Sequence, residues 1–270
     1  MGRHGLRRKG KFMWKEFAKK GSYFRELRAI KALQPHPFVT EMVDHWNSES
    51  DIRFTGVIEL TFYNGCDIHT WIDYHSIGSE LKFVKYVFQK VLLAYDYAVK
   101  QSIYHRDIKP ENIMLNERGV VKLIDWELCS FTPYSRKRVG TEEYMAEEVH
   151  FKKYYNCMKS DVWSLAVVMF GLATGKRPYE YMGIGEFGQD PWLSSMYDKR
   201  WKSFWLQMEK PRNFPVLDDD FKLCLQNMFE KNPEDRPTIE DLLCDDIFYG
   251  PLIEPEQIVE EMQNTLPPSF

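Results

Sequence analysis

The chain has 270 residues, of which 44% are apolar, 15% aromatic and 28% charged, and its 36 Lys and Arg against 40 Asp and Glu give a formal net charge of −4. This composition excludes an intrinsically disordered chain, because it supplies enough apolar residues for a sizeable core. No apolar stretch is as long as a membrane-spanning helix, and the N-terminus lacks the apolar core of a signal peptide. We therefore expect a soluble cytoplasmic or otherwise intracellular protein, with no membrane partner.

The first twenty residues are strongly basic, with eight Lys or Arg and one Glu. A basic arm of this kind can contact an anionic partner. The first basic positions have no interleaved aromatic residues, which single-stranded nucleic-acid binding would favour. We therefore predict a solvated arm and no nucleic-acid partner.

The first half of the chain predicts helices and short strands. Apolar residues recur at helical spacing over residues 23–33, and a prolyl turn follows them. A strand-like run covers residues 54–60, and a long amphipathic helix is expected to start from Ser79 as its N-cap. Two short apolar runs on either side of residues 116–119 then predict a hairpin.

The second half predicts mainly helices. Residues 162–174 are apolar nearly all round, which indicates a buried helix. An aromatic stripe over residues 197–208 is typical of core, and residues 217–229 open another helix. Thr238 and Asp241 form a capping box for the next helix. The expected fold class is therefore α+β, with strands mainly in the first sixty residues.

Polar residues that suit acid–base chemistry and metal binding lie next to the predicted hairpin. Asp107 and Lys109 lie two apart, so the carboxylate can orient a hydroxyl while the cation neutralises a transferring anion. Asn112 and Asp125 flank the hairpin and offer the hard oxygen ligands that suit Mg²⁺. The alternative is a set of polar turn residues that only satisfy backbone groups.

Several motifs in order resemble those of the eukaryotic protein kinase family. They are His105-Arg106-Asp107-Ile108-Lys109-Pro110-Glu111-Asn112, Asp125-Trp126-Glu127, Gly140-Thr141-Glu142-Glu143-Tyr144-Met145-Ala146-Glu147-Glu148, Asp161-Val162-Trp163-Ser164-Leu165 and Asp235-Arg236-Pro237-Thr238. The resemblance covers most of the chain. It implies a bilobal kinase-like fold with a truncated small lobe at residues 1–60, a large lobe at 61–253 and an acidic tail at 254–270.

The resemblance assigns roles to the polar cluster. Asp107 would be the catalytic base and Lys109 would contact the γ-phosphate of ATP. Asn112 and Asp125 would hold Mg²⁺, so the implied cofactors are ATP and Mg²⁺. Lys109 together with Thr141 favours Ser or Thr as the acceptor residue in a protein substrate.

The resemblance also assigns the nucleotide-binding residues. Lys15 would be the ATP lysine, with Lys11 as the fallback. Glu26 would be its ion-pair partner, although the spacing of eleven residues is shorter than usual in the family. Glu59 and Leu60 would belong to the hinge that binds adenine through its backbone.

Other positions would support the large lobe or regulate it. Asp161 would anchor the catalytic-loop backbone, and Arg236 would pair with Glu148. Arg106, directly before the catalytic Asp, implies regulation by a phosphate in segment 126–147. The candidate acceptors are Thr132, Tyr134 and Ser135.

The sequence also departs from the family pattern. The glycine-rich loop would fall before Met1, so we expect it and its strands to be missing and the small lobe to begin at its third strand. Glu127 replaces the glycine after Asp125, where a carboxylate could add a metal ligand or repel a triphosphate. Glu147 stands where proline is usual.

Two functions remain open on the sequence. One is a Ser/Thr protein kinase that transfers the γ-phosphate of Mg-ATP to protein hydroxyls; the other is a pseudokinase that acts as a scaffold or binding module. A third possibility is a partner that covers the nucleotide site. Asp190-Pro191-Trp192 with residues 200–205 resembles the calcium/calmodulin-dependent kinase group.

Overall fold

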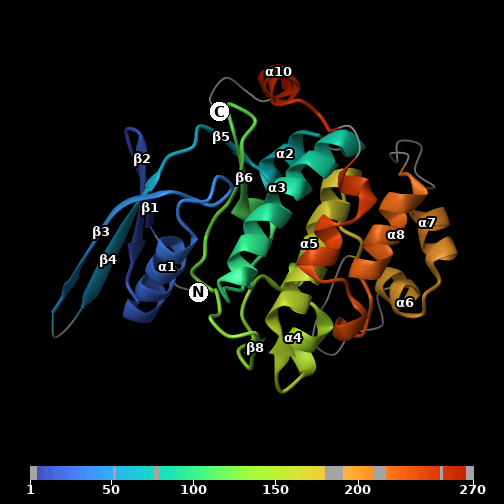
Figure 1. Ribbon diagram of the computed structural model, residues 1–270, viewed down its shortest axis with the longest axis horizontal. Coiled ribbons are helices and arrows are strands. Elements are labelled where there is room, and N and C mark those ends of the chain that lie inside the picture. The colour runs from blue at the N-terminus through green and yellow to red at the C-terminus, as the bar shows by residue number, and fades with distance from the viewer. Residues whose placement is uncertain are drawn as a thin grey trace.

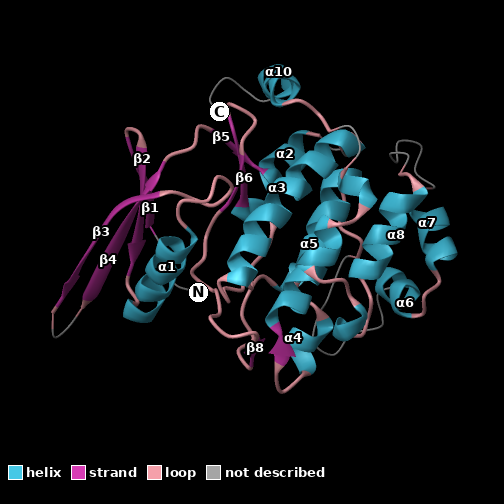
Figure 2. Cartoon of the chain, in the orientation of Figure 1, coloured by secondary structure: helices cyan, strands magenta, loops and turns pink. Residues whose placement is uncertain are grey.

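The computed structural model describes residues 5–50, 53–75, 79–179, 191–209, 217–249 and 252–265. An antiparallel sheet with one helix is built from the first part of the chain, and a mainly helical body from the rest (Figure 1). The strands are β1 Gly5–Lys9, β2 Phe12–Phe17, β3 Met42–Glu49, β4 Phe54–Thr61, β5 Gly65–Asp67, β6 Ile113–Asn116, β7 Val121–Leu123, β8 Tyr134–Ser135 and β9 Tyr155–Asn156. The helices are α1 Lys20–Leu33, α2 Ile68–Tyr74, α3 Leu81–Lys100, α4 Glu147–Phe151, α5 Cys157–Thr174, α6 Pro191–Tyr197, α7 Trp201–Met208, α8 Asp219–Met228, α9 Ile239–Leu243 and α10 Pro255–Thr265. The strands of each sheet pair antiparallel and the helices form most of the second part of the chain, which confirms the α+β prediction (Figure 2).

The four-stranded sheet has the order β1-β2-β4-β3, with antiparallel neighbours. Helix α1 packs on it through Tyr23 and Leu27, which share a small core with Phe17 and Ile58. Gly56 of β4 permits this close approach, because a Cβ there would lie 2.5 Å from the Tyr23 ring. The central strand β2 carries Lys15 directly opposite Ile58.

The predicted solvated arm is wrong for the residues of β1, which pair with β2, the strand that carries Lys15. These strands pair along their whole length across a turn at Gly10, whose φ of +63° suits glycine. Arg7 lies 3.6 Å from Glu16, and the Arg8 guanidinium lies 4.0 Å above the Phe62 ring. The charged residues of β1 therefore lie on an edge strand of the sheet, and within the described residues one strand precedes the strand of Lys15, where none was predicted.

Strand β3 was not predicted, because its sequence is largely polar. It forms the other edge of the sheet, and most of its side chains are exposed. Trp46 is also exposed, at 40%, although its ring packs edge-on against that of Trp14 in β2, with 5.1 Å between the ring centroids. The predicted strand at residues 54–60 is confirmed as β4.

The predicted buried helix is confirmed as α5, whose side chains are nearly all inaccessible to solvent. Its length and mean hydropathy of 1.2 would also suit a membrane span, but 94% of it is buried inside the protein. Among the residues that the structure describes, α5 is the one helix that passes this test. Its apolar surface is therefore explained by the core of the helical body.

The long helix α3 is confirmed, but Ser79 is not its N-cap. The cap position is Glu80, and it makes no side-chain capping bond. The Ser79 hydroxyl instead accepts a hydrogen bond of 2.9 Å from the indole Nε1 of Trp71 in α2. A buried indole N–H without an acceptor is costly, so the Ser79 hydroxyl serves as the acceptor of Trp71 and does not cap α3.

The remaining helix predictions hold. The aromatic stripe packs inward, with Phe204 and Trp205 buried. Helix α8 begins after Asp218, whose carboxylate accepts from the Phe221 N–H, and Thr238 with Asp241 completes a capping box before α9. The predicted acidic tail contains α10, which buries Ile258 and Met262 in the main core.

Candidate active site

The hairpin of β6 and β7 brings the predicted metal ligands to one end. Ile113 pairs with Leu123, and the Ile124 N–H donates to the Asn112 carbonyl at 3.0 Å. Asn112 and Asp125 therefore both lie at the open end of the hairpin. The hard oxygen donors that the sequence predicted are on the same side of the body as the catalytic loop.

Asp107 sits in a network of donors. The Thr141 hydroxyl donates to its Oδ1 at 2.8 Å, and Asn112 Nδ2 donates to its backbone carbonyl at 2.7 Å. The ammonium of Lys109 lies 3.9 Å from Oδ2. The Asp107 carboxylate thus accepts a hydrogen bond from a hydroxyl at Oδ1 and lies near a cation at Oδ2.

The backbone around Asp107 is locally strained. Arg106 and Asp125 have φ of 65° and 62°, in the left-handed region that side chains other than glycine rarely adopt. The Arg106 N–H is held by the buried carboxylate of Asp161 at 2.9 Å. Asp161 therefore anchors the catalytic-loop backbone as predicted, and strain of this kind concentrates at functional sites.

His105 links the two segments. Its Nε2 lies 3.0 Å from the Ile124 carbonyl, and its Nδ1 lies 3.3 Å from the Asp107 N–H. This pattern fits a neutral ring that donates from Nε2 and accepts at Nδ1. Burial lowers the pKa of His105, and the ring also contacts Trp126 at 4.6 Å between centroids.

Lys15 lies at the centre of the charged groups. Its ammonium is 2.6 Å from Glu26 Oε2 in α1 and 2.7 Å from Asp125 Oδ1. The predicted Lys15–Glu26 pair therefore forms despite its short sequence spacing. Lys11 lies exposed in the turn between β1 and β2, so the fallback is not used.

Burial and charge act against each other here. Burial opposes the charge of Lys15, but Glu26 and Asp125 together raise its pKa above the usual value. Burial raises the pKa of Glu26 to about 7, against the attraction of Lys15. Burial also acts to raise the pKa of Asp125, but Lys15 outweighs it and the pKa is lowered. We assign Lys15 and Asp125 as charged.

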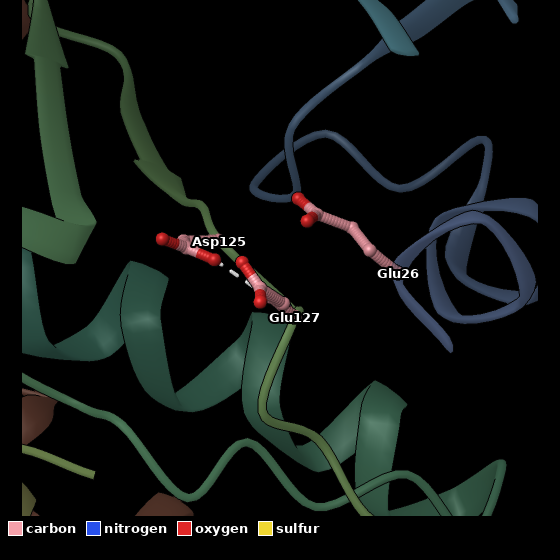
Figure 3. Close-up of side chains that lie close together, drawn as sticks. All are labelled: Glu26, Asp125 and Glu127. Carbon is pink, nitrogen blue, oxygen red and sulfur yellow. Dashed lines mark hydrogen bonds between the residues drawn. The ribbon is translucent and has the colours of Figure 1, made fainter. Parts of the chain in front are cut away.

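Glu127 joins the same group. Its carboxylate is 3.8 Å from the Lys15 ammonium, and Arg25 Nη1 donates to its backbone carbonyl at 3.0 Å. Its φ is not among the positive values of the described residues, so this position does not need glycine. Figure 3 shows the carboxylates of Glu26, Asp125 and Glu127 directed toward one another, and one oxygen of each lies within 4.8 Å of the others.

The predicted hinge residues lie near the C-terminal end of β4, and their role in binding adenine stays a prediction. Glu59 and Leu60 are inside β4, where Glu59 pairs with Trp14 and Leu60 with Met13. Glu59 Oε1 also accepts from the Trp14 indole at 2.7 Å. The strand runs on to Thr61, because the sheet is paired on both sides up to that point, so the connection to the helical body begins after these residues.

Glu148 and Arg236 form the predicted large-lobe ion pair. The two guanidinium nitrogens Nη1 and Nη2 contact the two carboxylate oxygens at 2.6 and 3.0 Å. Both side chains are almost fully buried. Glu147 begins α4, where a carboxylate in the first turn suits the helix dipole, so the loss of proline is tolerated.

The candidate phosphate acceptors differ in position. Ser135 Oγ accepts from Arg106 Nη1 at 2.7 Å. Thr132 instead bonds to its neighbours in the loop, and Tyr134 is 53% exposed. Of the three predicted acceptors, Ser135 is the one in contact with Arg106.

Sequence reasoning missed two contributions to the site. The Arg25 contact with the Glu127 carbonyl depends on how α1 lies against the segment after β7, and no local pattern indicates it. The Thr141 hydroxyl was noted as a marker of acceptor type, but its hydrogen bond to Asp107 was not foreseen. Asp190 of the proposed group motif lies outside the described residues, so that group assignment stays a prediction.

Comparison with known proteins agrees with this geometry. A family model described as the protein kinase domain matches residues 9–248. CBL-interacting serine/threonine-protein kinase 9 of Arabidopsis thaliana is 31% identical over 230 residues, which is 83% of this chain and 47% of the relative. CBL-interacting protein kinase 9 of Oryza sativa subsp. japonica is 29% identical over 230 residues, or 83% of this chain and 46% of the relative. The chain thus spans about half the length of the curated relatives it matches. Because the family model covers most of the chain and its motif residues gather around Asp107 and Lys15, the chain belongs to the eukaryotic Ser/Thr protein kinase family.

Proposed function

We propose that the protein is an active Ser/Thr protein kinase. The observation that carries the proposal is the state of Asp107, whose carboxylate already accepts a hydrogen bond from a threonine hydroxyl at 2.8 Å. A substrate Ser or Thr hydroxyl that replaces Thr141 would meet the same oxygen. Lys109, 3.9 Å from the other oxygen, supplies positive charge next to it.

Asn112 and Asp125 fit the magnesium role. The amide nitrogen of Asn112 is fixed on the Asp107 carbonyl, which leaves its Oδ1 as the ligand atom. The Asp125 side chain is 39% exposed, so it keeps accessible surface besides its contact with Lys15. An amide oxygen and a carboxylate are ligands that Mg²⁺ accepts. Mg-ATP, when bound, would supply the phosphoryl group.

The residues of this chain would then divide the work. Asp107 orients the acceptor hydroxyl and takes its proton, while Lys109 balances charge on the transferring group. Lys15, held by Glu26, would contact the phosphates nearer the nucleoside. The left-handed backbone at Arg106 and Asp125 keeps these side chains in place before substrate arrives.

A pseudokinase is the second candidate, and Glu127 is the observation that favours it. Its carboxylate adds negative charge beside Lys15, where a triphosphate would bring more. In this alternative the fold serves as a scaffold or binding module. The names of the relatives above include a protein partner, CBL. For this chain we propose only that it binds proteins, either as substrates or as partners. We also propose that it does so in the cytoplasm or another intracellular compartment.

Phosphotransfer to a generic protein substrate with millimolar Mg-ATP tests the proposal. We expect transfer by the wild-type chain and a loss of at least about a hundredfold in Asp107→Asn, since a positioned base contributes that much or more. Glu117→Gln, an exposed change at the far turn of the hairpin, should leave transfer unchanged. Equal phosphate incorporation by wild type and Asp107→Asn would support the pseudokinase instead.

A further inference from the structure

A hollow of about 370 Å³ on the helical body is lined by residues of α4, β8 and β9. Helix α4 and β8 lie at the same end of this body (Figure 1). The lining includes Tyr134 and Tyr154, whose rings pack edge-on with 6.0 Å between their centroids. The two residues are 53% and 58% exposed. Adjacent exposed aromatic residues of this kind offer apolar surface to a partner.

Two lysines of the same lining carry charge that the protein does not balance. Lys152 and Lys153 follow α4 directly and are exposed. Within the described ranges neither ammonium forms an ion pair or a hydrogen bond, whereas Arg138 contacts Glu142 at 2.6 Å. Both lysines can therefore pair with an anion from another molecule.

Two more cations lie beside the hollow. Arg136 and Lys137 follow β8 and are exposed. The hydroxyl of Tyr155, which belongs to the lining, donates to the Lys137 carbonyl at 2.9 Å. Of the basic run 136–138, Arg138 alone has a carboxylate partner in the described part of the chain.

The carboxylates of the lining do not cancel these charges. Both oxygens of Glu148 are held by the buried guanidinium of Arg236. Glu234, which is exposed, is the other carboxylate among the lining residues. Four cations therefore lie in or beside the hollow against one carboxylate that Arg236 does not neutralise, and this balance favours an anionic occupant.

The hollow is connected to the catalytic loop through β8. Arg106, the residue before Asp107, donates to Ser135 Oγ at 2.7 Å, and Ser135 pairs with Tyr155 of the lining. A protein that places its acceptor hydroxyl at Asp107 therefore has this surface close to its neighbouring segments.

We propose that this hollow binds an acidic stretch of the protein substrate, separate from the Ser or Thr that accepts phosphate. Carboxylates of the stretch pair with Lys152 and Lys153, and its apolar side chains pack on Tyr134 and Tyr154. The role in substrate binding rests on the function proposed above, whereas the binding of an acidic stretch does not require phosphotransfer.

A protein segment fits this surface better than a nucleic acid does. A single strand needs a basic groove that follows its phosphate backbone over several nucleotides. The adjoining hollow shares Lys152 but combines three further carboxylates with Lys199 and Lys231. The basic surface is therefore short.

Fluorescence anisotropy of the intact chain with a labelled Glu-rich peptide that contains one Ser and one Leu tests the binding. We expect binding that weakens as salt is added, and none to the same peptide with every Glu replaced by Lys. Lys152→Ala with Lys153→Ala should lower the affinity about tenfold, the loss expected for two partly exposed ion pairs. Lys82→Ala with Lys202→Ala removes the same charge from exposed positions outside the hollow and should bind as wild type does. Thermal unfolding establishes that both variants are folded.

Phosphotransfer to the same two peptides tests the role in substrate binding. In Lys152→Ala with Lys153→Ala, KM for the acidic peptide should rise about tenfold with kcat unchanged, because the two lysines bind the substrate without contact to the reacting groups. The KM for the Lys-containing peptide should stay the same.

Three results would overturn the proposal. The first is equal affinity of wild type and Lys152→Ala with Lys153→Ala for the acidic peptide. The second is a single-stranded oligonucleotide that binds more tightly than the peptide and loses affinity in the same variant. The third is a KM that does not change although peptide affinity falls. A chain that binds the acidic peptide as expected but transfers no phosphate would contradict the proposed function while it supports the acidic binding site.

Discussion

Two buried charge clusters in this protein differ in balance. In the helical body, Arg236 meets Glu148 through two hydrogen bonds of 2.6 and 3.0 Å. The remaining guanidinium contacts go to backbone carbonyls of Glu230 and Lys159, and the group lies 5.0 Å above the Trp163 ring. One cation meets one anion, and the guanidinium is satisfied.

The cluster around Lys15 brings more carboxylates to its cation. Three carboxylates share one ammonium, and a buried oxygen of Glu26 has no partner. A satisfied cluster has nothing left to bind, so it serves the fold. The Lys15 cluster instead keeps a buried carboxylate oxygen that is not hydrogen-bonded, and a buried polar atom in that state raises the free energy of the folded protein.

The largest effect should come from breaking the balanced pair. Arg236→Leu leaves Glu148 charged and buried without its partner, and loss of one member of a buried pair costs about 3–5 kcal/mol of unfolding free energy. Urea denaturation measures this cost. The double variant Arg236→Leu with Glu148→Leu should recover part of it, because no charge is then stranded. A double variant less stable than the single one would show that packing and not charge dominates.

Arg106 is a third buried charged group, and its hydrogen-bond acceptors differ from those in the two clusters. In the part of the chain that the structure describes, its guanidinium donates to two backbone carbonyls and to Ser135 Oγ, and to no carboxylate. A buried cation without an anion fits the predicted control by phosphorylation. The anionic partner of Arg106 would then be a phosphate group that is added to the chain after synthesis.

Phosphorylation of Ser135 should stabilise the protein. A phosphate there converts a neutral contact into charge-assisted hydrogen bonds, which are worth about 2 kcal/mol. Thermal unfolding before and after phosphatase treatment measures the difference. Ser135→Ala should abolish it, whereas Thr132→Ala, a matched change in the same loop, should not. Mass spectrometry that finds no phosphate on Ser135 in protein from its native cells would contradict the prediction.

The sequence predicts the large-lobe cluster better than the small-lobe sheet. Arg236 and Glu148 belong to fixed motifs, and α5 is apolar all round, so both follow from local pattern. Strands β1 and β3 do not, because they are sheet edges whose exposed side chains are largely polar and lack an apolar alternation. Their charges resemble those of a solvated arm until the pairing partner is known.

The cluster around Lys15 shows the same limit of sequence-based prediction for single residues. The motif positions predicted that Lys15, Glu26 and Asp125 would come together, and they do. Glu127 was recognised as a departure, but its approach to Lys15 depends on tertiary contacts such as the one with Arg25. Sequence spacing shows which residues are close along the chain, but only the tertiary structure shows how many carboxylates lie close to one cation.

The smallest of these effects should have the opposite sign to the first. Glu127→Gln removes a carboxylate that lies close to those of Asp125 and Glu26, and its side chain is only 12% exposed, so we expect a gain of about 1 kcal/mol in unfolding free energy. Urea denaturation is the measurement. Glu117→Gln controls for the general effect of removing a charge. A Glu127→Gln variant less stable than wild type would mean that the Glu127 carboxylate gains more from cations such as Lys15 than it loses to its neighbouring carboxylates.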